Sequence, residues 1–145
     1  MITDAYLQLS SAQAVTASAV STNTIDLGVA RDIGTGEDLE VHISVDVAAT
    51  AAGAATVNFQ VITSASANLS TPTILGQTDA IPKTSLTVGA RFVLPIPPSI
   101  GSNGQRYFGV QYTVATGPLT AGSFTATVVK DVEDRKTYAS GFSVT

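Results

Sequence analysis

The sequence contains no cysteine and no tryptophan, and it has a single histidine among its 145 residues. Without cysteine the fold cannot depend on disulfides, and a metal site cannot use thiolate ligands. Charged residues make up only 12% of the chain, against about 25% in ordinary soluble domains. The net charge is −4, and the seven basic residues are scattered. Because phosphate binding requires clustered cations, we expect no nucleic-acid partner.

Long apolar runs are also missing from the sequence. No apolar run approaches the roughly 18 residues needed to span a bilayer. The N-terminal sequence MITDAYLQLSS has no basic region before an apolar stretch, so we expect no signal peptide and no membrane partner. A chain of this length fits one domain with a sizeable core, and we treat residues 1–145 as a single domain.

Residue patterns that support catalysis or metal binding are sparse. His42 is the only imidazole, and no Gly-x-Ser-x-Gly motif is present. The densest carboxylate set is Asp131, Glu133 and Asp134, which lacks the regular spacing of a calcium-binding loop and is followed by two competing basic residues. We therefore expect no enzyme activity, no cofactor, no metal site and no small-molecule substrate.

Apolar residues recur at every second position along the chain, whereas helical periodicity is nearly absent. In LEVHISVDV, residues 39–47, the pattern predicts that the apolar side chains at the odd-numbered positions, from Leu39 to Val47, face a core. The polar side chains between them, such as His42 and Asp46, are predicted to face water. Comparable runs, separated by turn sequences, predict about eight strands. This pattern predicts an all-β sandwich or barrel.

Two loops are predicted to join hairpins. ATAAGAAT at 49–56 separates two alternating runs, and ATGPLTAG at 115–122 separates another two. Gly117 and Pro118 favour a turn, and Gly122 permits a positive φ that other residues resist. We expect the strands that flank each loop to pair with each other.

Both ends of the chain are rich in apolar residues, and we expect flexible terminal arms. Residues 1–13 contain Ile2, Tyr6, Leu7 and Leu9, more apolar area than a free tail should expose to water. This segment is either an arm that docks on another protein or the first strand of the sandwich. The C-terminal segment 133–145 presents the same two alternatives, and its candidate contact residues are Tyr138, Phe142 and Val144.

Two stretches carry the most distinctive sequence. Residues 10–41 read SSAQAVTASAVSTNTIDLGVARDIGTGEDLEV, and residues 104–132 read GQRYFGVQYTVATGPLTAGSFTATVVKDV. The order of AQAVT, IDLG, ARDIG, RYFGVQY and GPLTAG within them resembles the phage capsid cement proteins of the Bbp16 type.

This resemblance implies a β jelly roll that decorates the outer surface of an HK97-type bacteriophage head. The implied partners are the major capsid protein, across whose subunit junctions it would bind, and further copies of itself in a dimer or trimer. The implied location is the virion, preceded by the host cytoplasm during assembly. The alternative is a carbohydrate- or receptor-binding jelly-roll module of a phage tail or fibre, which would need exposed aromatic residues over a groove.

Overall fold

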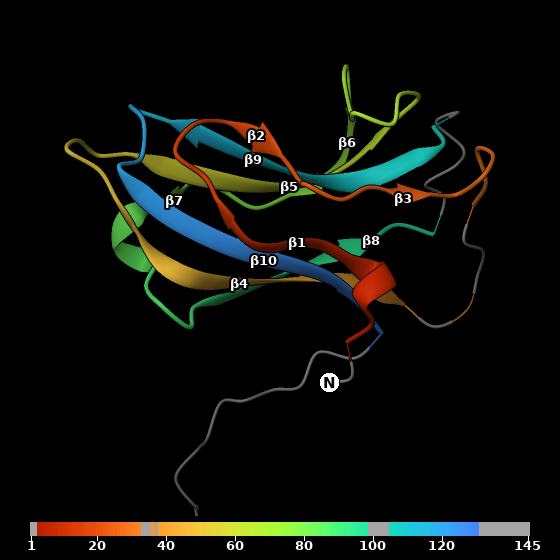
Figure 1. Ribbon diagram of the computed structural model, residues 1–145, viewed down its shortest axis with the longest axis horizontal. Coiled ribbons are helices and arrows are strands. Elements are labelled where there is room, and N and C mark those ends of the chain that lie inside the picture. Colours follow the sequence, from red (N-terminus) through yellow and green to blue (C-terminus); the bar gives the residue numbers. More distant parts are fainter. Residues whose placement is uncertain (1–2, 33–35, 37, 99–104, 131–145) are drawn as a thin grey trace, which may run out of the picture.

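The computed structural model describes residues 3–32, 36, 38–98 and 105–130, which form two antiparallel sheets packed face to face (Figure 1). Two short 3-10 turns, η1 and η2, accompany the strands. In chain order the elements are η1 (Ala5–Leu7), β1 (Gln8–Ala14), β2 (Ala19–Val20), β3 (Ile25–Asp26), β4 (Leu39–Thr50), β5 (Thr56–Ser64), β6 (Thr73–Gln77), β7 (Ile81–Pro82), η2 (Lys83–Ser85), β8 (Arg91–Ile96), β9 (Tyr107–Ala115) and β10 (Ala121–Val129).

The strand order is that of a jelly roll. One sheet has the order β1-β10-β4-β8, and the other has the order β2-β9-β5-β6, with β3 also paired to β9 and β7 also paired to β5. The short strands β2 and β3 both pair with β9 and together fill one strand position, and β6 and β7, which both pair with β5, fill another. The resulting eight positions run 1-8-3-6 in the first sheet and 2-7-4-5 in the second. The predicted all-β sandwich is confirmed, with jelly-roll topology; the described residues contain ten strands, which fill eight strand positions, where about eight strands were predicted.

Both predicted hairpins are wrong, because each of the two loops crosses from one sheet to the other. Strands β4 and β10 lie side by side in the first sheet, whereas β5 and β9 pair in the second. The 115–120 loop packs across the end of the sandwich, where Leu119 is 3% exposed and its N–H donates to the Thr16 carbonyl at 2.9 Å. The turn residues fix a local reversal, but burial of two apolar sheet faces determines the pairing.

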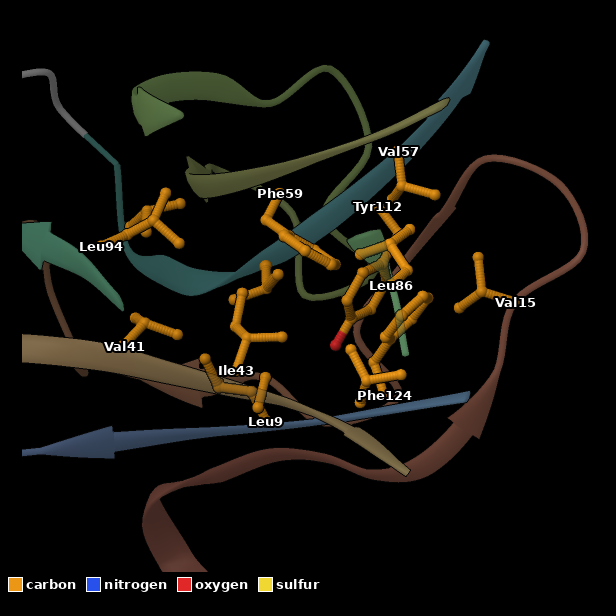
Figure 2. Packing of buried hydrophobic residues seen from close by; sticks show 14 of the residues in the cluster. Leu9, Val15, Val41, Ile43, Val57, Phe59, Leu86, Leu94, Tyr112 and Phe124 are labelled. Atoms are coloured by element: carbon orange, nitrogen blue, oxygen red, sulfur yellow. The ribbon is translucent and has the colours of Figure 1, made fainter. Parts of the chain in front are cut away.

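Aromatic side chains fill the centre of the core between the two sheets (Figure 2). The Phe59 and Phe124 ring centroids lie 5.2 Å apart in an edge-to-face contact, and Tyr112 stacks on Phe124 at 5.5 Å. The Tyr112 hydroxyl forms a buried 2.5 Å hydrogen bond with Ser10 Oγ. Burial raises the pKa of Tyr112 to about 12, although the bond to Ser10 acts in the opposite direction.

Strand β4 departs from the simple alternation that the sequence predicts. Val45 is buried as expected, but Val47 is 49% exposed because the register with β10 shifts between Phe124 and Ser123. Such a bulge turns the following side chains to the opposite face. His42 also differs from the prediction: it lies on the outer face of its sheet but is only 6% exposed, because it forms part of a groove described below.

The loop between β5 and β6 covers part of the outer face of the second sheet. Leu69 in this loop is 1% exposed although it lies outside the central core cluster. It packs so closely on Gly109 of β9 that a Cβ at Gly109 would lie 2.4 Å from Leu69 Cδ1. The glycine therefore permits the loop to lie flat on the sheet.

Candidate functional site

The turn η1 precedes the first strand and presents an aromatic side chain to solvent. The Asp4 carboxylate accepts a hydrogen bond from the Tyr6 N–H at 2.9 Å, and the Asp4 carbonyl accepts one from the Leu7 N–H at 3.0 Å. These bonds satisfy N–H groups that a first turn otherwise leaves without partners. Tyr6 is 92% exposed and Leu7 is 38% exposed. The turn η1 thus lies beside the end of β10 (Figure 1), and its residue Tyr6 is exposed to solvent.

The structure separates the candidate contact residues of the N-terminal segment. Tyr6 and Leu7 lie at the surface, whereas Leu9 is 0% exposed and packs into the core beside Ile43 (Figure 2). The assignment of Leu9 to a contact surface is therefore wrong, because β1 pairs with β10 and places Leu9 between the sheets. From Gln8 onward the segment is the first strand of the sandwich.

The remaining candidates fall outside the described residues. These are Ile2 at the N-terminus and Tyr138, Phe142 and Val144 in the C-terminal segment 133–145. The carboxylates considered for calcium, Asp131, Glu133 and Asp134, fall outside them as well.

An apolar pocket of about 130 Å³ lies at the same end of the sandwich as η1. Its location follows from the strand ends that contribute to it: Leu39 begins β4, Ile96 ends β8, and Val128 lies near the end of β10. All of its lining side chains are aliphatic or phenyl groups: Leu7, Ile25, Leu27, Leu39, Ile96, Phe108 and Val128. We refer to this feature as the end pocket.

An ion pair fixes the chain segment that forms one wall of the end pocket. Arg106 Nε lies 2.6 Å from Asp26 Oδ1, and its second nitrogen lies 2.7 Å from Oδ2. The hydrogen bond from Arg106, together with one from the Gly28 N–H, lowers the pKa of Asp26 to about 2. Both side chains are nearly half exposed, so the pair contributes little stability, but its bidentate geometry orients the residues on either side of Asp26.

A polar groove of about 430 Å³ crosses the outer face of the first sheet, starting next to η1. Strands β4, β8 and β10 contribute its floor, which includes the buried His42, and the N-terminal residues contribute one side. The lining residues are Thr3, Asp4, Ala5, Gln8, His42, Ser44, Arg91, Thr125 and Thr127. We refer to this feature as the outer groove.

No group of three or more histidine, cysteine, aspartate or glutamate side chains is arranged to hold a metal ion within the described part of the chain. The same part of the chain contains no helix that is long and apolar enough to cross a membrane.

The family model of Bbp16 matches residues 9–128, which is more than half of the chain. The chain belongs to the Bbp16 family. Bbp16 is a phage-related family. No curated protein matches the chain.

The segment that matches the Bbp16 family coincides with the jelly roll itself. It begins at Leu9 in β1 and ends at Val128 in β10, so it includes every strand position of both sheets. Tyr6 and the C-terminal segment lie outside the match, on either side of it. The family assignment therefore concerns the scaffold.

Sequence reasoning did not find the end pocket or the outer groove. The pocket combines side chains from both sheets that are far apart in the sequence, so no local motif announces it. For the groove a partial signal exists: Ser44 on β4 and Thr125 on β10 are paired neighbours, and both place short hydroxyl side chains on the outer face.

Proposed function

We propose that this Bbp16-family protein is a capsid cement protein of a bacteriophage. It binds the outer surface of an HK97-type head across junctions between major capsid protein subunits, acts as a dimer or trimer, and stabilises the shell. The observation that carries the proposal is the family match over the whole jelly roll, residues 9–128. The proposed location is the virion, after assembly in the host cytoplasm.

The end of the sandwich near η1 supports this proposal as a contact surface. Tyr6 is almost fully exposed in a turn that its neighbour Asp4 holds in place. Tyrosine is enriched at protein interfaces because it combines a large apolar ring with a hydroxyl that can form a hydrogen bond. An exposed aromatic side chain on a hydrogen-bonded turn is suited to protein binding.

The proposed mechanism is mechanical and depends on many simultaneous contacts. A protein bound across a seam adds interface that must break before the subunits separate. An oligomer that contacts several subunits gains about 10²–10⁴-fold over one isolated site through effective concentration. The charged fraction of only 12% also limits the desolvation cost of burying surface against another protein.

The direct test is co-sedimentation of the purified chain with expanded capsids that lack it. The proposal predicts saturable binding, which Tyr6→Ala weakens. Val88→Ala is the matched control, because Val88 is also well exposed, at 68%, but lies between η2 and β8, away from η1. Failure of the unaltered protein to bind capsids would contradict the proposal, and equal binding by all three proteins would exclude Tyr6 as a contact.

The outer groove favours a second candidate, a carbohydrate- or receptor-binding module. Asp4 and Ala5 line the groove, and the exposed aromatic ring of Tyr6 follows them directly. This alternative requires exposed aromatic residues over a groove, and Tyr6 follows lining residues of the outer groove in the sequence without lining it. Titration with oligosaccharides from a bacterial surface, followed by NMR, would support it if the resonances of Arg91 and Thr127 shift and Arg91→Ala removes the effect. Absence of any shift would exclude it.

A further inference from the structure

The end pocket has the size and chemistry of a site for one side chain. Its volume is about 130 Å³, and every lining residue is apolar. An engineered apolar cavity of about 150 Å³ binds benzene, so this pocket matches one phenyl ring. Leu7 at the pocket remains 38% exposed. An occupant would therefore remove further apolar surface from water.

The C-terminal segment of the chain starts at this pocket. Val128 lines the pocket, and residues 131–145 continue from Lys130, two positions later. The twelve residues that follow Lys130, up to Phe142, span up to about 40 Å when extended, which is enough to reverse direction and return to the pocket. The segment therefore reaches the site without any rearrangement of the jelly roll.

One residue of this segment fits the pocket better than the others. Its large apolar residues are Tyr138, Phe142 and Val144. A buried tyrosine hydroxyl needs a hydrogen-bond partner, and no lining side chain of the pocket offers one. Val144 is smaller than the phenyl ring that the volume admits. Phe142 combines the matching size with the absence of polar atoms.

We propose that the end pocket binds the C-terminal segment of the same chain, with the Phe142 side chain as its occupant. Covalent attachment gives the segment an effective concentration of about millimolar, so binding within one chain prevails over exchange between chains at micromolar protein. The docked segment covers Leu7, which narrows the N-terminal contact surface to Tyr6. This proposal does not depend on capsid binding.

Disulfide trapping tests the proposal cleanly, because the chain contains no cysteine. In the full chain, Leu7→Cys is combined with Ser143→Cys, which leaves Phe142 in place. A disulfide requires Cα atoms about 4.4–6.8 Å apart, so rapid oxidation reports close approach. We expect a disulfide within one chain, seen as a faster monomer band on a non-reducing gel. The control pair Val88→Cys with Ser143→Cys should stay reduced.

A second pair of variants shows whether Phe142 is the anchor. Adding Phe142→Ala to the Leu7→Cys and Ser143→Cys chain should slow disulfide formation by about tenfold or more, whereas Phe142→Leu should restore most of the rate. Circular dichroism checks that each variant retains its β structure. Equal rates with and without Phe142 would overturn the proposal. A disulfide-linked dimer would overturn it too, because the occupant would then belong to a second copy.

Discussion

Replacing Leu9 by alanine tests whether the N-terminal segment belongs to the fold. Leu9 is 0% exposed and is part of the main core cluster. Full burial of a leucine side chain contributes about 1.5–3 kcal/mol, and the cavity left by its removal raises the cost of Leu→Ala to about 2–5 kcal/mol. We expect a loss of about 3 kcal/mol in the free energy of unfolding. Tyr6→Ala, at a position that is 92% exposed, should change it by less than about 0.5 kcal/mol.

The assay is urea denaturation followed by circular dichroism. With an m-value of about 1–3 kcal/mol/M, a loss of 3 kcal/mol lowers the midpoint by about 1–3 M at unchanged m. The chain has no tryptophan, so the fluorescence of its four tyrosines provides the second probe. If Leu9→Ala unfolds at the same urea concentration as the unaltered protein, β1 is not part of the cooperative core, and the reasoning from burial is refuted.

Three further predictions concern other parts of the molecule. Gly109→Ala should destabilise the protein by about 1–3 kcal/mol, because the new methyl group would lie 2.4 Å from the side chain of Leu69. Gly53→Ala is the control: the nearest atom to its new methyl group is 3.8 Å away, so this variant should unfold at nearly the same urea concentration as the unaltered protein. The pKa of Tyr112 is about 12 in the folded state, against an ordinary value of 10.0. Its contribution to the free energy of unfolding is therefore fully present below pH 10 and falls by about 3 kcal/mol as the pH rises toward 12. Urea midpoints measured across this range should fall for the unaltered protein and change less for Tyr112→Phe. An NMR titration should give a pKa of about 2 for the Asp26 carboxyl. The ion pair therefore stabilises the fold fully above pH 3.8, the ordinary pKa, and this contribution is lost as the pH falls through 2. Arg106→Gln should return the pKa of Asp26 toward 3.8, and an unchanged pKa would contradict the role of the ion pair.

Alternation in the sequence predicts strands well here, because most strands have one face on a single core. Val41, Ile43 and Val45 are buried as the pattern indicates. The pattern fails at Val47, where a register shift against β10 exposes the side chain. A bulge depends on the partner strand, and β10 is about 80 residues away in the sequence. Local alternation therefore contains no signal for it.

Strand pairing could not be read from the loops for a related reason. The residues Gly117 and Pro118 indicate a reversal of direction correctly, and Gly117 has a φ of 100°. A reversal between two strands can keep them in one sheet or pass them to the opposite sheet. In either arrangement the two strands bury the same apolar side chains, so the sequence of the two strands does not distinguish them. Only the combined burial of all strands selects the jelly roll.

Of the candidate site, only features that depend on a single residue could be predicted from the sequence. Tyr6 was identified as one of the apolar residues of segment 1–13, and the structure exposes it. Leu9 has the same apolar character, but pairing of β1 with β10 buries it. The end pocket forms from several strand ends that meet only in the folded protein. Its existence is a property of the tertiary structure.

The rupture temperature of expanded phage capsids tests the central proposal most directly. Capsids assembled without this protein are heated with and without the purified chain, and release of the packaged genome is followed with a DNA-binding dye. The account predicts that saturating protein raises the rupture temperature and that Tyr6→Ala reduces the increase. Identical rupture temperatures with and without the bound protein would contradict the account.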